Sequence, residues 1–375
     1  MSKLVEGIKD RMVAAAREAA PTVVDAAQKA ATAAAEKVAE AVADAKNAAG
    51  ETSVASEPVA AEPVAAEPVA AAHAPEGAIF NPENARGNLH LGIDVGSTTV
   101  KLAVLNDDNQ IVYAKYQRHH TDVRACARDL FEGAATVLPT AQMTCAITGS
   151  GGLLLSQWLD LEFVQEVIAS KRAVETLIPA TDVAIELGGE DAKIIFFGGA
   201  LEERMNGSCA GGTGAFIDQM ATLMNVTVPE LDQLSLKHEK IYPIASRCGV
   251  FAKSDIQPIL NQGGRKEDVA ASIFQAVVDQ TIAGLTQGRE LKGKIVFLGG
   301  PLHFLMGLRE RFVETLKLDS DHAIFPQDGD CFAAMGAALC ATDYDPVPFE
   351  TVLKKLEESV DTTTLVDTMP PLFKN

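Results

Sequence analysis

Hydrophobic and polar positions alternate with strand-like spacing from Leu89 onward. The segment "LHLGIDVGSTTVKLAVLNDDNQIVYAKYQ" has apolar runs broken at Gly96 and at 107–109, which predicts three strands joined by tight turns. Residues 123–138 change to a helical spacing, and "TCAITGSGG" then returns to a strand that ends in glycines. Strand and helix alternate as far as Pro179, so the pattern predicts an α/β fold.

The pattern restarts in the second part of the chain. "GIDVGSTTVKLAVL" (92–105) aligns without gaps on "AIELGGEDAKIIFF" (184–197), with an acid, a glycine and a lysine at the same places. "AITGSGG" likewise has a later counterpart in "VFLGGPL". An internal repeat of this kind predicts two similar α/β halves, over 89–180 and 181–342, with a ligand bound in the cleft between them.

The two ends of the chain differ in composition and pattern from the α/β region. Residues 1–48 are rich in alanine, with larger apolar residues at helical spacing, and predict a helical segment that is either a solvated tail or a docking helix. The five-residue repeat "EPVAA" lies within 49–88, which we expect to be an extended linker. Residues 343–375 predict a C-terminal tail with one short amphipathic helix.

Composition narrows the class of protein. The chain has 375 residues and a net charge of −19, which argues against nucleic-acid and anionic-membrane partners. No apolar run reaches the roughly 18 residues of a membrane span, and the charged N-terminus lacks a signal-peptide core. The six cysteines are scattered rather than framework-like, so we expect a reducing, cytoplasmic location.

Two turns carry candidate phosphate chemistry. In "DVGSTT" and "ELGGED", glycines let the backbone approach a ligand and aim N–H groups at it. Asp94 and Glu186 end the paired strands and are candidates to hold Mg²⁺, directly or through water. Lys101 and Lys193 are candidates to neutralise phosphate charge. Either turn alone is also typical of an ordinary β-hairpin, but the repeat favours a phosphate site.

Six motifs over residues 89–342 carry a family resemblance. The chain resembles the activator (archerase) ATPases of 2-hydroxyacyl-CoA dehydratases and benzoyl-CoA reductases, the BadF/BadG/BcrA/BcrD ATPase family, in "LGIDVGSTTVKLAVL", "AITGSGG", "IELGGEDAKII", "CAGGTGAFI", "RCGVFAKSDIQ" and "FLGGP". The resemblance implies the acetate and sugar kinase/Hsp70/actin fold, with two ribonuclease H-like subdomains and ATP between them.

The resemblance also implies a set of nucleotide-site residues. They are Asp94, Gly96, Ser97, Thr98 and Thr99 in the first phosphate motif, Gly188, Gly189, Glu190 and Asp191 in the second, and Gly299 and Gly300 on the adenosine side. We expect Asp94, Glu186 and Glu190 to be catalytic and Lys101 to contact phosphate. Glu190 departs from the family, where glutamine is more frequent, so its role is either water positioning or metal contact.

Two cysteines precede glycine-containing helix starts. Cys209 and Cys248 match the family's ligands to a single [4Fe–4S] cluster shared across a homodimer. A cubane cluster needs four thiolates, and a two-fold axis doubles the two cysteines of one chain to four. The other interpretation is that both are inert thiols, since cysteine is often a small core residue. Thr213, just after Cys209, lies in a turn that we expect to approach the nucleotide as well.

The resemblance implies an ATP-driven activator. Such a protein takes one electron from ferredoxin or flavodoxin and passes it to an iron–sulfur dehydratase or reductase, with ATP acting through different contacts in two conformations. The alternative is a small-molecule kinase, of the sugar or acetate type, on the same fold. A kinase has no need of the cysteine pair, and an actin-like or chaperone-like scaffold has no long insertion to support it.

Overall fold

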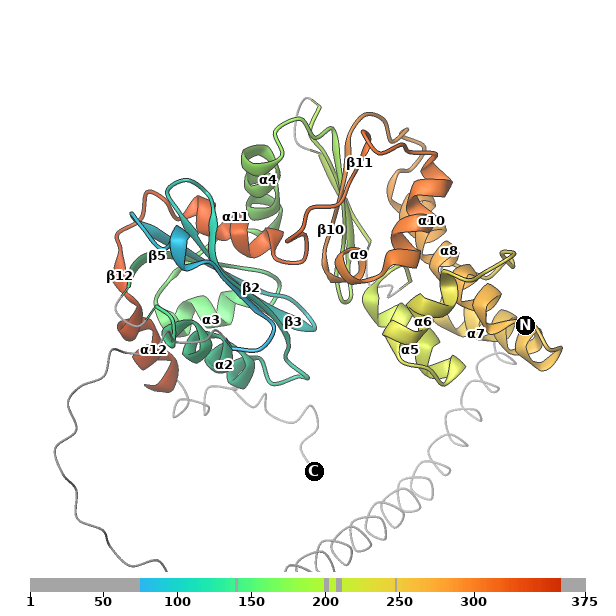
Figure 1. The fold of residues 1–375 in the computed structure, drawn as a ribbon, viewed down its shortest axis with the longest axis horizontal. Helices are drawn as coiled ribbons and strands as arrows, with labels where there is room; N and C mark the ends of the chain where they lie inside the picture. Colours follow the sequence, from blue (N-terminus) through green and yellow to red (C-terminus); the bar gives the residue numbers. More distant parts are fainter. Residues whose placement is uncertain (1–74, 139–140, 199–201, 207–210, 247, 359–375) are drawn as a thin grey trace, which may run out of the picture. The chain divides into compact units, whose positions relative to one another are not determined.

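A computed structural model describes residues 75–138, 141–198, 202–206, 211–246 and 248–358. All of them belong to the second of the two compact units into which the chain divides, Met1–Pro68 and Val69–Asn375. Within these residues the chain forms two mixed sheets, each with its own helices (Figure 1). The helical segment predicted over 1–48 and the proline repeat lie outside the described residues.

The first sheet contains the three strands predicted from the alternating pattern. Its order is β1 (Ala78–Phe80), β4 (Ile111–Arg118), β3 (Thr99–Asn106), β2 (Leu89–Val95), β5 (Gln142–Thr148) and β12 (Val347–Pro348), and β6 (Glu162–Phe163) also pairs with β5. Its core is closed by α2 (Val123–Ala135), α3 (Gly152–Leu159) and α12 (Phe349–Glu358). A short 3-10 turn, η1 (Pro82–Asn84), follows β1.

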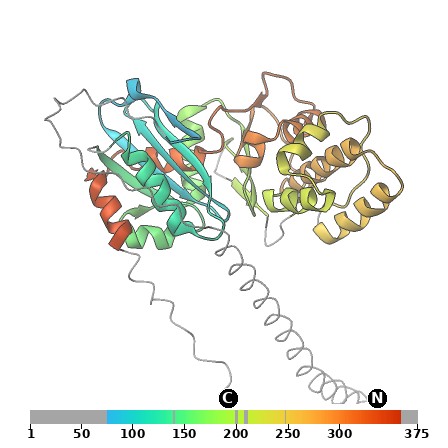
Figure 2. The same ribbon diagram turned by 60° about the horizontal axis from the view of Figure 1, so that its bottom comes forward.

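The second sheet carries the larger group of helices. Its order is β11 (Ala323–Ile324), β10 (Ile295–Leu298), β7 (Val183–Leu187), β8 (Ala192–Phe196) and β9 (Glu202–Met205). The helices of this half are α5 (Gly214–Met224), α6 (Val228–Ser235), α7 (Gly249–Asn261), α8 (Lys266–Leu285), α9 (Gly300–Phe304) and α10 (Met306–Leu316). Except for the short α9, whose Phe304 contacts Tyr116 of the first half, they lie on the side of the second sheet that faces away from the first half (Figures 1 and 2).

The two sheets repeat one topology. The order β4-β3-β2-β5-β6 in the first corresponds to β9-β8-β7-β10-β11 in the second, and every neighbouring pair has the same direction in both. In each sheet, read in this order, the first two pairs of neighbouring strands are antiparallel and the next two pairs are parallel. The predicted pair of ribonuclease H-like halves is therefore confirmed, and with it the acetate and sugar kinase/Hsp70/actin fold.

Two helices lie between the sheets. α4 (Glu166–Leu177) and α11 (Phe332–Cys340) pack on one another and share an apolar cluster with both sheets (Figure 1). Their contact depends on Gly336, where an added Cβ would lie 1.9 Å from the carbonyl oxygen of Ala169. Gly92 of β2 allows α11 an equally close approach, because a Cβ there would lie 1.8 Å from the carbonyl oxygen of Ala334. The interface is thus too close for any larger residue at either position.

The edges of the first half differ from the expected boundaries. Strand β1 lies in the range expected to be linker, and it pairs with β4 through Ile79 and Ala114. Helix α12 lies in the range expected to be a tail, yet Phe349 is buried and stacks on Phe131 of α2 with ring centroids 5.7 Å apart. Both segments complete the first sheet and its core, because an apolar face needs a partner wherever the chain supplies one.

Among the described residues, no helix combines the length and the apolar character that crossing a bilayer requires.

Candidate functional site

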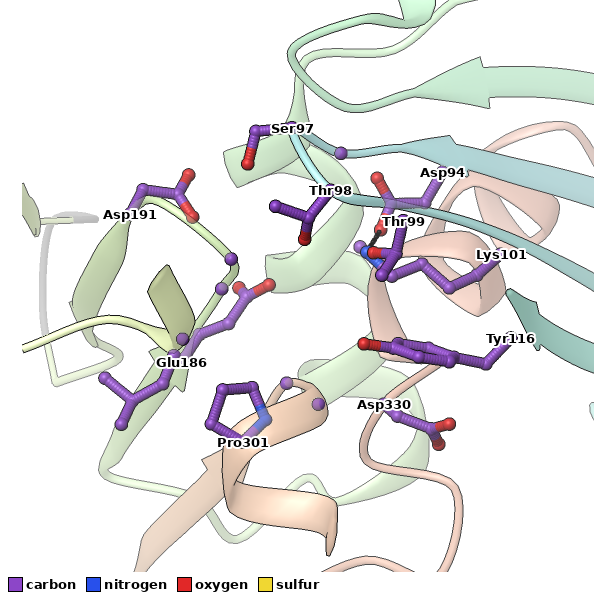
Figure 3. A pocket seen from close by; sticks show the side chains of 18 of the residues that line it. Asp94, Ser97, Thr98, Thr99, Lys101, Tyr116, Glu186, Asp191, Pro301 and Asp330 are labelled. Carbon is purple, nitrogen blue, oxygen red and sulfur yellow. Dashed lines mark hydrogen bonds and ion pairs between the residues drawn. The ribbon is translucent and has the colours of Figure 1, made fainter. Parts of the chain in front are cut away.

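A pocket lies where the two halves face each other, and most of the predicted nucleotide residues line it (Figure 3). The predicted residues that line it are Asp94, Gly96, Ser97, Thr98, Thr99, Lys101, Glu186, Gly188, Gly189, Asp191, Gly299 and Gly300. Glu190 is exposed and does not line the pocket. Thr213 is buried behind the lining, as the residue before α5, while its neighbour Gly214 is part of the lining.

The first turn joins β2 to β3 and presents one acid–lysine pair to the pocket. The register sets Asp94 opposite Lys101, and the lysine Nζ donates to Asp94 Oδ2 at 2.7 Å. Burial opposes the charge on Lys101, but the Asp94 carboxylate outweighs it and raises the pKa of the lysine above its usual value. Asp94 Oδ1 is buried and has no hydrogen-bond partner. An orphaned carboxylate oxygen at a pocket wall fits a cation that enters with a ligand.

The second turn joins β7 to β8 and repeats the backbone of the first. Its amide at Gly188 donates to the carbonyl of Asp191 at 2.8 Å, as the Gly96 amide donates to Thr99 at 2.9 Å. The lysine differs, however. Lys193 is buried, pairs with Glu166 and with Asp191 at 3.2 Å, and does not line the pocket. The second turn therefore presents carboxylates rather than a cation.

The two turns approach each other across the pocket. A Cβ added to Gly189 would lie 2.1 Å from Thr98 Oγ1, so the glycine backbone faces a side chain of the other half. Ser97 and Thr98 point toward Glu186 and Asp191 (Figure 3). Backbone amides and hydroxyls on two facing turns are suited to hold a chain of phosphates from both sides.

Helix α5 is attached to the second turn. The amide of Gly214 donates to the carbonyl of Gly188 at 3.0 Å, and the amide of Ala215 donates to the carbonyl of Gly189 at 2.7 Å. These amides are among those that a helix N-terminus leaves without an intrahelical partner. A shift of the second turn would therefore pull directly on the start of α5.

Several lining residues were not predicted from the sequence. Glu166 begins α4, and burial raises its pKa to about 7 even though Lys193 acts in the opposite direction. Asp330 stands before α11, and its pKa is also raised by burial. Neither belongs to the repeated hairpins, so no local signal identified them. The other lining residues outside the prediction include Tyr116, Arg118, Ser150 and Asp218.

An apolar pocket of about 500 Å³ adjoins the phosphate turns. It extends to Phe304, and it shares with the first pocket Tyr116, Arg118, Gly214, Asp218, Gly300 and Pro301. The rings of Tyr116 and Phe304 meet edge to face, with centroids 5.4 Å apart. It lies beside "FLGGP", the segment predicted to form the adenosine side, and its aromatic and apolar walls are of the kind that suit a base.

Of the predicted cluster ligands, one can be located. Cys248 is half-buried and is the residue immediately before α7, whereas Cys209 lies outside the described residues. Helix α7 begins against α5, since a Cβ on Gly249 would lie 3.0 Å from Gln219 Oε1. No group of three or more metal-ligating side chains occurs in the part of the chain that the structure describes. One partly exposed thiol at a helix start fits a site completed by other segments or a second subunit.

Three of the remaining cysteines have the character of core residues, and Cys340 is half-buried. Cys126, Cys145 and Cys331 are buried, and burial raises the pKa of Cys126 to about 11 and that of Cys145 to about 12. A thiol with such a pKa is protonated at neutral pH and is a poor ligand or nucleophile.

A repeated ribonuclease H-like half with facing phosphate turns defines a protein of the acetate and sugar kinase/Hsp70/actin fold. The sequence matches the BadF/BadG/BcrA/BcrD ATPase family over residues 91–341, and the chain belongs to this family. The predicted family resemblance is thereby confirmed.

Two relatives with assigned roles support the family assignment. The chain is 32% identical over 259 residues to the (R)-2-hydroxyglutaryl-CoA dehydratase activating ATPase of Acidaminococcus fermentans, covering 67% of this chain and 96% of that protein. It is 29% identical to the 2-hydroxyisocaproyl-CoA dehydratase activator of Clostridioides difficile, covering 68% and 94%.

Solved structures are similar over the same region. The crystal structure of the Acidaminococcus fermentans (R)-2-hydroxyglutaryl-CoA dehydratase component A has a TM-score of 0.62 at 28% identity, covering 71% of this chain and 99% of that one. The activator of the 2-hydroxyisocaproyl-CoA dehydratase from Clostridium difficile, with bound ADPNP, has a TM-score of 0.59 at 25% identity, covering 73% and 97%.

Proposed function

We propose that this chain is an ATP-dependent activator that passes a low-potential electron to an iron–sulfur partner enzyme. The observation that carries the proposal is the pair of hydrogen bonds from Gly214 and Ala215 of α5 to the carbonyls of Gly188 and Gly189. They tie a phosphate turn to the helix that follows Cys209 and that packs beside the start of α7 at Cys248. A change at the phosphates thus has a short covalent and hydrogen-bonded route to both cysteines.

ATP is the ligand proposed for the cleft. The facing turns, the adjoining apolar pocket and a relative crystallised with ADPNP support a nucleotide there. Asp94 and Glu186 would hold Mg²⁺, directly or through water, and Lys101 would lie beside the phosphates. The ion, when bound, neutralises phosphate charge and so favours hydrolysis. Asp94, with an unpartnered buried oxygen, is the residue best suited to that ion.

A [4Fe–4S] cluster is the proposed electron carrier. Cys209 and Cys248 of each of two subunits would supply the four thiolates, and the cluster supplies reversible one-electron chemistry when bound. Val250 and Phe251, in the first turn of α7, have exposed fractions of 71% and 66%. Two large apolar side chains beside a cysteine suit an interface, which a homodimer would bury.

The proposed partners follow from the relatives. Those with assigned roles activate 2-hydroxyacyl-CoA dehydratases, so the acceptor is proposed to be an iron–sulfur dehydratase or reductase of this kind. Ferredoxin or flavodoxin is the proposed donor, in the cytoplasm. ATP would act by making different contacts in two conformations of the cleft, which is the only way a ligand shifts such an equilibrium.

Iron analysis tests the proposal and separates it from a small-molecule kinase. The full chain, purified without oxygen, is expected to contain four irons per dimer by metal analysis combined with size-exclusion chromatography. Cys248→Ser is expected to lose the iron, because one mutation removes two ligands from a shared cluster, and to weaken the dimer. Cys340→Ser, which alters another partly exposed thiol, is the matched control and should keep the iron. Four irons per monomer, or a Cys248→Ser protein with full iron, would contradict the shared cluster.

A further inference from the structure

Strand β4 of the first half reaches across to the second half with one face. Tyr116 and Arg118 are two residues apart and so point to the same side of the strand. A Cβ added to Gly300 would lie 2.6 Å from the Tyr116 hydroxyl oxygen. Arg118 extends to Asp218 of α5. This face therefore joins the first half both to the nucleoside side of the pocket and to α5.

The contact between Arg118 and Asp218 has two hydrogen bonds. Arg118 Nη1 donates to Asp218 Oδ2 at 3.0 Å, and Nη2 donates to Oδ1 at 3.4 Å. The side chains have exposed fractions of 50% and 39%, so water screens the pair and limits its strength. An exposed pair of this kind can exchange partners at small cost.

Arg118 is also part of the phosphate pocket. It lies opposite Thr99 in the register of β3 and β4, and the next amide, His119, donates to the carbonyl of Thr98 at 3.1 Å. The backbone of Arg118 is thus fixed beside the first phosphate turn, and its side chain lines the pocket. Phosphate oxygens carry more charge than a carboxylate and match the guanidinium fork equally well.

Asp218 lies one turn into the helix whose first amides hold the second phosphate turn. Helix α5 packs in the core of the second half through its apolar face, and it has two polar attachments at the cleft: the carbonyls of Gly188 and Gly189 at its start, and Arg118 from the other half. A nucleotide that took Arg118 would leave only the first of these attachments.

We propose that Arg118 exchanges Asp218 for a phosphate oxygen of the bound nucleotide and thereby releases α5 from the first half. This rests on the proposed function in assuming a nucleotide in the cleft, and it adds a positioning residue that the sequence motifs do not include. Arg118 would then link occupancy of the cleft to the helix beside the cysteines.

Measurements of nucleotide affinity test the exchange, because the exchange predicts that a change at Arg118 weakens ADP binding and a change at Asp218 tightens it. The measurement is calorimetric titration of the full chain with ADP and Mg²⁺, with adenosine as the phosphate-free control. Arg118→Ala is expected to weaken ADP binding by about tenfold to a hundredfold, because a charge-assisted contact to phosphate is lost, and to weaken adenosine binding far less, because adenosine carries no phosphate. Asp218→Asn is expected to tighten ADP binding by about threefold, because Arg118 no longer has a competing partner. The double variant should bind ADP as Arg118→Ala does.

Hydrogen exchange of residues 219–224, which do not line the pocket, gives a second readout. Without nucleotide, Asp218→Asn should exchange there about threefold faster than the parent chain, and ADP should bring the parent toward the same rate. If both single variants shift ADP affinity in the same direction, or neither shifts it, the exchange is wrong while the nucleotide site stands. If the parent chain binds no ADP, the proposed function fails and this inference fails with it.

Discussion

The two phosphate turns share a backbone and differ in their charges. Each follows an acid at the end of a strand, each is closed by an amide that donates to the carbonyl three residues later, and each faces a lysine on the return strand. In the first turn Lys101 stays at the pocket with Asp94. In the second, Lys193 is withdrawn into the protein and bonded to Glu166. Similar local sequences thus present an acid–lysine pair to the pocket on one side and carboxylates alone on the other.

Helix α4 causes the difference. Its first residue, Glu166, lies beside the second turn and takes the lysine, while Ser170 one turn later donates to Glu186 Oε2 at 3.2 Å. Around the first turn, Asp94 keeps one buried oxygen without a partner. The comparison suggests that the first turn is arranged to receive a ligand and its cation, whereas part of the second serves the packing of α4.

The largest expected effect comes from exchanging the acids of the two turns for amides. Asp94→Asn should lower the rate of ATP hydrolysis by about a hundredfold or more, because the carboxylate with the unpartnered oxygen is lost from the proposed metal site. Glu186→Gln should cost about tenfold, since Ser170 already takes up part of that carboxylate. Steady-state hydrolysis with Mg²⁺ measures both, and circular dichroism checks the fold. Parent rates in Asp94→Asn would contradict the assignment of the first turn.

Substitutions at the two lysines should affect different properties: Lys193 the stability of the fold, and Lys101 the binding of ADP. Lys193→Met is expected to lower the free energy of unfolding by about 2–3 kcal/mol at pH 8, because Glu166 and Asp191 lose a buried partner. Lys101→Met should instead weaken ADP binding, which Lys193→Met leaves unchanged. Chemical denaturation and calorimetry measure the two effects, and Lys171→Met, which removes a surface pair with Glu175, is the stability control.

The destabilisation caused by Lys193→Met should depend on pH. The pKa of Glu166 is raised on folding from an ordinary 4.5 to about 7, so its ionisation costs stability as the pH rises through that window. At pH 5 the carboxyl is protonated in the folded chain and needs no lysine. The destabilisation by Lys193→Met should therefore be smaller at pH 5 than at pH 8, and an equal loss at both would show that Glu166 is not the group responsible.

The smallest expected effect concerns the approach of the turns. In Gly189→Ala, the new methyl group would lie 2.1 Å from Thr98 Oγ1, which forces the halves apart and should weaken ADP binding by about tenfold. In Gly96→Ala, the methyl group would lie 3.2 Å from Lys101 Nζ and 3.4 Å from the carbonyl oxygen of Thr99, which are far looser contacts, so a loss of about twofold is expected. Adding Thr98→Ala to Gly189→Ala should restore part of the affinity. No recovery would mean that the two turns do not close on the ligand.

Local chemistry explains why the repeated hairpins and their glycine turns were predictable. A strand that ends in an acid and a turn that closes through its own backbone are determined by neighbouring residues, so Asp94, Gly96, Gly188 and Gly189 were expected to meet in one cleft and do so. The alternation of strand and helix likewise predicted the α/β class and the internal repeat predicted the two halves, whereas their fold was implied by the family resemblance. These features depend on short sequence separations, where hydrogen bonding and side-chain periodicity act directly.

The other features of the fold and the site depend on packing between residues that are far apart in the sequence. Strand β1 and helix α12 join the first half because its sheet edge and core are completed by distant segments. Glu166 at the start of α4, Asp330 before α11 and Asp218 one turn into α5 reach the cleft from positions outside the motifs. Whether a lysine faces the ligand or the interior also depends on which acid the neighbouring helix brings to it. The reason is physical: a side chain's charge environment is set by everything folded around it, and sequence neighbours are only a small part of that.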